Sequence, residues 1–134
     1  MEPDLVTEPR LVGVLQELMN REPLFHRREL VSSRESFERE TAAVWETGAS
    51  GRRYSREFVW ATLQQRYERS NVDEYETERW QTRDSHLREI APSTYLLTYT
   101  LWGQDDRLTR RLTVWQGSIR DGWKVLYHQG TVAG

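Results

Sequence analysis

Apolar residues near the start of the chain recur at the three- and four-residue spacing of an amphipathic helix. Leu11, Leu15 and Leu18 follow this spacing and predict a first helix over about residues 7–21. Pro23 lies just beyond, where a proline ends or kinks a helix because it lacks a backbone N–H. The opening of the chain is therefore expected to be helical, with one apolar face available for a core.

Two further helices are predicted from their capping residues. Ser32 followed by Glu35 is a capping-box pattern and predicts a short second helix that ends near Thr41. Ser55 is a typical N-cap, and Glu57 places a negative charge in the first turn of a third helix. The predicted buried stripe of that helix comprises Val59, Leu63 and Tyr67, with Trp60 beside them.

A short strand and a glycine-bearing turn are expected between the second and third helices. Residues 44–47 suit a strand, and the sequence Gly48-Ala49-Ser50-Gly51 follows directly. Glycine adopts positive φ without steric cost, so Gly48 and Gly51 predict a tight turn. Ser50 is expected to hydrogen-bond the backbone of this turn, as serine often does.

Beyond residue 70 the pattern changes to that of β-strands, and turn-forming residues at 91–93, 103–106 and 120–122 separate the segments. The predicted strands are Trp80–Ile90, Tyr95–Trp102, Leu108–Trp115 and Trp123–Val132. Helices followed by a meander predict an α+β fold, in which a curved antiparallel sheet wraps around the N-terminal helices as a cone. Because such a sheet leaves one end open, a cavity is expected there.

The composition narrows the class of protein. The 134 residues fit a single domain spanning 1–134, and the absence of cysteine excludes a disulfide-stapled scaffold and favours the cytoplasm. No long apolar run follows the N-terminus, so neither a signal peptide nor a transmembrane helix is expected. The net charge of −2 offers no overall field for nucleic acid. Neither nucleic acid nor a membrane is therefore expected as a partner.

Four segments carry a family resemblance: residues 46–56 (ETGASGRRYSR), 97–99 (LTY), 111–115 (RLTVW) and 122–131, which begins Gly-Trp and ends His-Gln-Gly-Thr. Together with the order of elements, they resemble the nuclear transport factor 2-like superfamily, and within it the SnoaL-like branch of small bacterial proteins. The resemblance implies a cystatin-like cone and a homodimer. The superfamily includes isomerases, dehydratases, epoxide hydrolases, polyketide cyclases, transport factors and oligomerisation domains, so it implies no single activity.

Two charged residues stand in the middle of predicted strands. Glu46 lies beside Val44 and Trp45, and Arg111 lies between Leu108 and Val114, where a buried charge is costly without a partner. We expect the two side chains to meet, or both to face the cavity, where Arg111 could fix an anionic or carbonyl group. The alternative is a structural ion pair or a contact with solvent at the rim.

His128 is the best acid–base candidate, because imidazole titrates near neutral pH. Strict strand alternation places it on the same face as Lys124 and opposite Val125, Tyr127 and Gln129. If Lys124 is exposed, His128 lies on the outer face, as a structural or interface histidine. Tyr127 and Gln129 then point inward.

Aromatic and hydroxyl side chains complete the candidate lining. Tyrosines at positions 54, 99 and 127 could donate hydrogen bonds to an oxyanion, or could be core residues with satisfied hydroxyls. Tryptophans at positions 45, 102, 115 and 123 could form a ligand wall, or could serve core and dimer packing. The predicted pocket residues are Trp45, Glu46, Tyr54, Tyr99, Arg111, Thr113, Trp115, Tyr127, His128 and Gln129.

Two functional hypotheses remain open. The first is a small-molecule-binding protein with a cone-shaped pocket, with or without SnoaL-like catalysis, whose ligand and catalytic residues the sequence does not name. The second is a non-enzymatic homodimeric interaction module with a self-filled core. A cavity well below about 300 Å³ would favour the module. No cofactor is expected, and the three scattered histidines predict no metal site.

Overall fold

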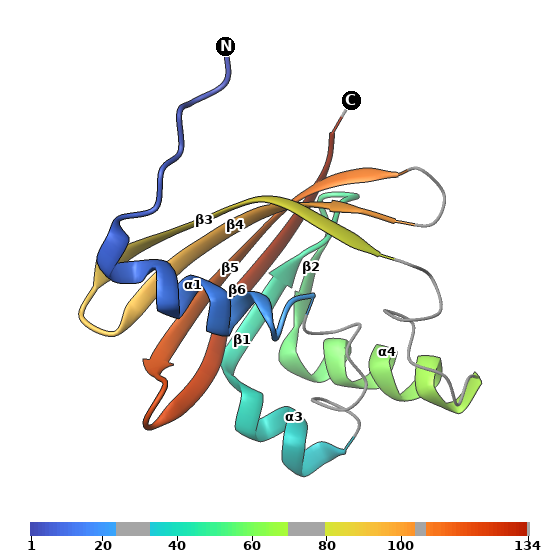
Figure 1. The fold of residues 1–134 in the computed structure, drawn as a ribbon. Coiled ribbons are helices and arrows are strands. Elements are labelled where there is room, and N and C mark those ends of the chain that lie inside the picture. Colours follow the sequence, from blue (N-terminus) through green and yellow to red (C-terminus); the bar gives the residue numbers. More distant parts are fainter. Residues whose placement is uncertain (24–32, 70–79, 104–106, 134) are drawn as a thin grey trace.

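The computed structural model describes residues 1–23, 33–69, 80–103 and 107–133, with residues 67–69 described by their backbone alone. Helices lie on one side of a curved sheet (Figure 1). The helical elements are η1 (Pro9–Leu11), α1 (Val12–Met19), α3 (Arg34–Glu40) and α4 (Arg56–Arg69). The strands are β1 (Thr41–Thr47), β2 (Arg53–Ser55), β3 (Gln81–Ala91), β4 (Thr94–Trp102), β5 (Leu108–Ser118) and β6 (Gly122–Val132).

The six strands form one sheet in the order β2-β1-β6-β5-β4-β3. Strands β3 to β6 are the predicted antiparallel meander, and β2 pairs antiparallel with β1. Strand β1 runs parallel to β6, which departs from the expected antiparallel pattern at this one pairing. The pairing brings Glu46 opposite His128, so the first and last strands of the chain meet. The result is the predicted α+β cone.

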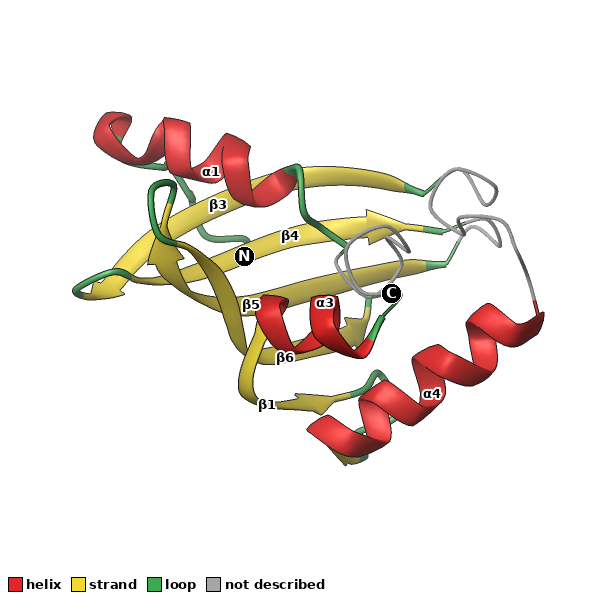
Figure 2. Cartoon of the chain, turned by 90° about the horizontal axis from the view of Figure 1, so that it is seen from below, coloured by secondary structure: helices red, strands yellow, loops and turns green. Residues whose placement is uncertain are grey.

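The helices cover the concave face of the sheet (Figure 2). Helix α1 packs on β3, α3 contacts β1 and β6, and α4 contacts β1 and β2. A charged contact ties the end of α1 to the end of α3, because Arg21 Nη1 lies 2.6 Å from Glu40 Oε2. The space between α4 and the inner face of β1 and β6 is where the candidate site lies.

The helix starts show how far capping patterns predict boundaries. In α3 the capping box is closed by Ser33 and Ser36, not by the expected Ser32 and Glu35, and Ser32 lies outside the described residues. Ser36 takes the place of the usual Glu because its hydroxyl also reaches the backbone N–H of Ser33. The predicted cap of α4 is confirmed, since Ser55 Oγ accepts from the Phe58 N–H at 3.1 Å.

The predicted turn after β1 is present, and its glycines differ in role. Gly51 adopts a φ of 88°. Gly48 does not have positive φ; a Cβ there would lie 3.0 Å from the Tyr54 ring, so a larger residue would require that ring to shift. Ser50 Oγ accepts from the Arg52 N–H at 3.4 Å, as expected. The turn leads into β2, a strand that the sequence pattern did not predict.

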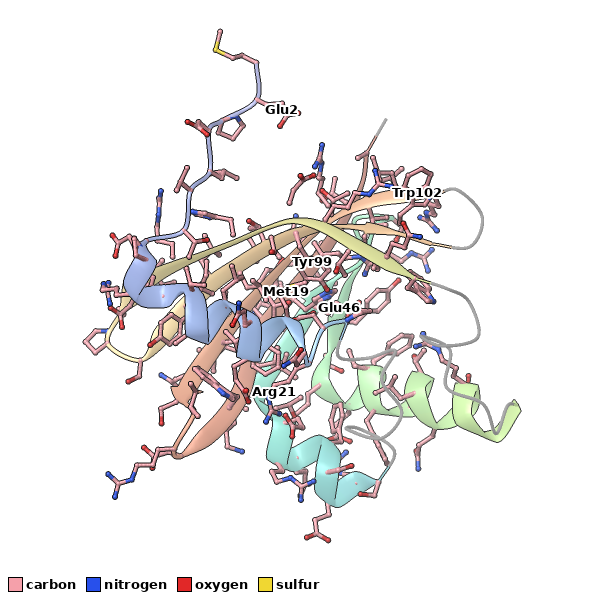
Figure 3. The ribbon with its side chains drawn as sticks, in the orientation of Figure 1. Glu2, Met19, Arg21, Glu46, Tyr99 and Trp102 are labelled. Atoms are coloured by element: carbon pink, nitrogen blue, oxygen red, sulfur yellow. The ribbon has the colours of Figure 1, made fainter. Side chains whose placement is uncertain are left out.

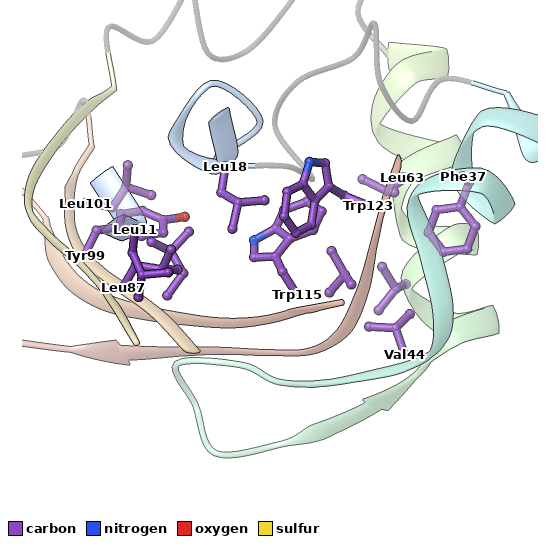
Figure 4. Packing of buried hydrophobic residues seen from close by; sticks show 13 residues of the cluster. Leu11, Leu18, Phe37, Val44, Leu63, Leu87, Tyr99, Leu101, Trp115 and Trp123 are labelled. Carbon is purple, nitrogen blue, oxygen red and sulfur yellow. The ribbon is translucent and has the colours of Figure 1, made fainter. Parts of the chain in front are cut away.

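The core lies between the sheet and the helices (Figure 4). Leu18 of α1 packs against the inner face of the sheet, where Trp115 and Trp123 are almost completely buried. The other members of the cluster are Leu11, Phe37, Val44, Val59, Leu63, Leu87, Leu97, Tyr99, Leu101 and Val125. Burial of this apolar surface is the main driving force that holds the helices in the cone.

A β-bulge in β6 changes which side chains face the core. Val114 pairs with Tyr127 but Trp115 pairs with Val125, so β6 holds one extra residue at Leu126. Such a residue reverses the alternation of the side chains beyond it. Val125 and His128 therefore both point toward the helices. The expectation that His128 follows exposed Lys124 to the outer face is wrong.

Candidate functional site

A cavity of about 300 Å³ lies between α4 and the inner face of β1, β5 and β6. Its apolar wall comes from Pro23 and from Phe58, Val59 and Leu63 of α4. The sheet supplies Glu46, Arg111 and His128, and Tyr54, Thr62 and Arg66 complete the lining. The cavity therefore joins an apolar helix face to a charged sheet face.

Glu46 lies on β1, on the inner side of the sheet (Figure 3). Its side chain is 21% exposed, and its Oε2 lies 3.9 Å from His128 Nδ1. Burial raises the pKa of Glu46 above its ordinary value, and the positive charges of Arg111 and Arg66 partly oppose this effect. Among the described residues, none donates a hydrogen bond to the Glu46 carboxylate. The side chain is a largely desolvated acceptor aimed into the cavity.

Arg111 lies on β5, where it pairs with Gly130 of β6. Its guanidinium lies across the β6 backbone; a Cβ at Gly130 would be 3.1 Å from Arg111 Nη1. Arg111 Nε donates to Thr109 Oγ1 at 2.9 Å, and within the described ranges its two Nη groups donate no hydrogen bond to the protein. Glu46 and Arg111 both line the cavity. They do not form a direct ion pair.

His128 lies between these two residues on the sheet face of the cavity. It pairs with Glu46 of β1 on one side and with Thr113 of β5 on the other. Its side chain is 9% exposed. An imidazole can act as a general acid or base, so His128, next to Glu46, can exchange a proton with a bound ligand. Arg111 can stabilise a negative oxygen beside them.

A buried glutamate that the sequence analysis did not consider lies deeper in the cone. Glu22 is 1% exposed. Its carboxyl group accepts from Tyr99 Oη at 2.6 Å and from Trp115 Nε1 at 3.1 Å. Tyr99 and Trp115 thus serve the core beside the cavity, and the hydroxyl of Tyr99 is satisfied there. The only signal for Glu22 in the sequence is its place directly before Pro23, which says nothing of its partners.

Three other predicted pocket residues lie on the outer face of the sheet. Tyr127 Oη lies 2.7 Å from both Thr47 Oγ1 and Gln129 Oε1. Trp45 is 46% exposed, and its ring centroid lies 4.5 Å from that of Tyr127. The expectation that Tyr127 and Gln129 point inward is wrong, because the bulge turns His128 inward instead. Thr113 is buried on the inner face but does not line the cavity.

The described part of the chain contains no group of three or more His, Cys, Asp or Glu side chains that could hold a metal ion. No helix within the same residues has the length and apolar character needed to span a membrane.

No protein-family model and no curated protein sequence matches this chain. Solved structures do. An uncharacterised protein with a cystatin-like fold from Caulobacter vibrioides superposes with a TM-score of 0.64 at 13% identity, covering 93% of this chain and 91% of that one. A nuclear transport factor 2-like protein from Cytophaga hutchinsonii gives 0.56 at 16% identity, covering 95% and 100%. A candidate ketosteroid isomerase from Parabacteroides distasonis gives 0.60 at 12% identity, covering 96% and 95%.

These similarities establish the fold. The chain has the nuclear transport factor 2-like, cystatin-like α+β fold that the sequence predicted, over nearly its whole length. Proteins with this fold differ in function, so the activity has to be argued from the side chains of the site.

Proposed function

We propose that this protein binds a small organic molecule in the cavity between the sheet and α4. The observation that carries the proposal is the meeting of Glu46, Arg111 and His128 on one side of a cavity of about 300 Å³ whose opposite wall is apolar. Ligand pockets range from about 300 to 1,000 Å³ and combine apolar walls with a few polar groups. The volume supports ligand binding over an interaction module with a self-filled core.

The environment of the Glu46 carboxylate supports the same proposal. A partly buried carboxylate that receives no hydrogen bond from the described residues lowers the stability of the fold, because burial removes water that would otherwise solvate it. Residues in that condition are frequent in binding and catalytic sites, where a ligand supplies the missing donor. Glu46, Tyr54, Arg111 and His128 are the proposed ligand contacts. Catalysis is compatible with this site, since Glu46 and His128 can move a proton, but binding alone requires no reaction.

A fragment screen followed by ¹H–¹⁵N NMR tests the proposal. Thr62 is exposed and lines the cavity, so Thr62→Trp adds bulk to its opening without altering the core, and Thr62→Val is the matched control. We expect ligands that shift the resonances of His128 and of α4 to bind wild type and Thr62→Val but not Thr62→Trp. Equal binding to all three proteins, or shifts confined to the outer face, would rule out the cavity as the site.

A second candidate function is homodimerisation through the outer face of the sheet. The observation that favours it is the exposure of Trp45, which is 46% accessible and packs beside Tyr127. Large apolar side chains exposed in this way often mark protein–protein contacts. We expect light scattering to report a dimer for wild type and a monomer for Trp45→Glu. A monomeric wild type at high concentration would refute the dimer and leave the cavity proposal standing.

A further inference from the structure

We infer that the ligand carries a neutral, carboxamide-like head on an apolar body, with a hydrogen-bond acceptor directed at Arg111 and a neighbouring donor directed at Glu46. The inference rests on the proposed ligand-binding function and names the chemical class that this site selects.

The need for a donor on the ligand comes from Glu46. Its carboxylate can accept several hydrogen bonds, yet no described residue donates one, and His128 Nδ1 remains 3.9 Å away. That distance is too long for a hydrogen bond. A ligand N–H or O–H placed against Glu46 would therefore satisfy a group that the protein leaves open.

The need for an acceptor comes from Arg111. Thr109 holds Nε at 2.9 Å, which fixes the guanidinium and leaves the two Nη groups without an acceptor among the described residues. Gly130 leaves room for the guanidinium to cross β6, because a Cβ at this position would lie 3.1 Å from Arg111 Nη1. Arg111 is thus held in place with its open donors inside the cavity, and a ligand carbonyl oxygen can accept from them.

The register of the strands explains why the ligand has to join these residues. Glu46 pairs with His128, whereas Arg111 pairs with Gly130, two positions further along β6. Their backbones therefore lie on opposite sides of β6, about two strand spacings apart across the sheet and two residues apart along it, or ~12 Å in all. The two side chains approach each other across β6 without making an ion pair. A small head group with adjacent acceptor and donor atoms fits between them.

The charges of the lining argue against charged head groups. A carboxylate would gain from Arg111 and Arg66 but would face the Glu46 carboxylate with no donor to offer it. An amine would gain from Glu46 but would lie near both arginines, which already act electrostatically on Glu46. A carboxamide or lactam presents C=O and N–H side by side and avoids both repulsions. The apolar body of the ligand would then contact Phe58, Val59 and Leu63.

Four probes with one common body test the inference: phenylacetamide, methyl phenylacetate, phenylacetate and 2-phenylethylamine. Their dissociation constants are measured by NMR titration at neutral pH. We expect the amide to bind wild type about tenfold or more tightly than each of the others, since one hydrogen bond to a charged group is worth about that factor. Phenylacetate or the amine binding more tightly than the amide would overturn the inference.

Two variants test the donor and the acceptor of the head group separately. Glu46→Gln should reduce the preference for the amide over the ester and should strengthen binding of phenylacetate, because the repulsion is removed and the new amide can donate. Arg111→Met should weaken amide binding about tenfold or more. Arg110→Met is the matched control, because Arg110 is the neighbouring arginine, pairs with Asp84, and does not line the cavity. It should bind all four probes as wild type does.

The outcomes distinguish this inference from the proposed function. If phenylacetate binds best and Thr62→Trp blocks it, the cavity binds ligands but the carboxamide assignment is wrong. If none of the four probes binds while the fragment screen finds other cavity ligands, the assignment is again wrong. If neither experiment finds a cavity ligand, both the assignment and the proposed function fail. If Arg111→Met does not fold, Arg111→Lys replaces it. This variant keeps the positive charge but lacks the two Nη donors of the guanidinium, so it should show the same loss of affinity for the amide.

Discussion

The buried carboxyl group of Glu22 offers a direct test of how the cone is held together. Glu22→Gln is nearly isosteric, but the new amide has one acceptor oxygen where the carboxyl had two. One of the donors, Tyr99 Oη at 2.6 Å or Trp115 Nε1 at 3.1 Å, must then face an NH₂ group inside the core. A buried donor left unsatisfied costs about 1–3 kcal/mol, and we expect the free energy of unfolding to fall by that amount. Since a domain of this size has roughly 5–15 kcal/mol in total, the change is easily measured.

Urea unfolding followed by far-ultraviolet circular dichroism measures the effect without relying on the fluorescence of Trp115. The control is Glu17→Gln, because Glu17 is 37% exposed and lies 3.8 Å from Arg21, a contact expected to contribute less than about 0.5 kcal/mol. Tyr99→Phe and the double variant complete a cycle, with an expected coupling of about 0.5–3 kcal/mol. A loss below about 0.5 kcal/mol for Glu22→Gln, or no coupling to Tyr99, would refute this account of the core.

Three further outcomes are expected. Gly130→Ala should leave the free energy of unfolding within about 1 kcal/mol of wild type. It should weaken phenylacetamide binding by about tenfold, because the new Cβ lies 3.1 Å from Arg111 Nη1. An affinity in an NMR titration equal to that of wild type would contradict this prediction. Burial raises the pKa of Glu46, so the native protein retains this proton where the unfolded chain, with an ordinary pKa near 4.3, has lost it. The free energy of unfolding of wild type should therefore fall relative to that of Glu46→Gln as the pH rises through the pKa of Glu46 in the folded protein. A difference between the two proteins in urea unfolding that is constant from pH 4 to pH 8 would contradict this prediction. Ser33→Ala should lower the unfolding free energy by about 1 kcal/mol, because Ser33 Oγ accepts from the Ser36 N–H at 3.0 Å; thermal or urea unfolding identical to wild type would count against the cap.

Local patterns predicted most of the fold. The helical spacing of Leu11, Leu15 and Leu18 identified the first helical region, although the α-helix itself covers only Val12–Met19. The alternation after residue 80 identified all four strands of the meander, and Ser55 identified the start of α4. These features depend on neighbours along the chain, which is the information that a single sequence carries.

The features that depend on contacts between distant parts of the chain were not predicted. The extra residue at Leu126 reverses the side-chain direction in β6, and nothing in the apolar pair Leu126–Tyr127 marks it. A bulge of this kind decides whether His128 or Tyr127 enters the cone. Glu22 was missed because both of its known partners, Tyr99 and Trp115, are far along the chain, on β4 and β5. The sequence therefore predicted the two charged residues of the site, Glu46 and Arg111, but not the full set of residues that line the cavity.

The central claim is that an open cavity on the concave side of the sheet accepts a neutral donor–acceptor molecule. A crystal structure of the protein grown with phenylacetamide tests it most directly. The account predicts density in the cavity with the amide nitrogen within hydrogen-bond distance of Glu46, the amide oxygen within hydrogen-bond distance of Arg111, and the ring against Phe58 and Leu63. A cavity filled by the protein's own side chains, or a probe bound only on the outer face beside Trp45, would contradict it.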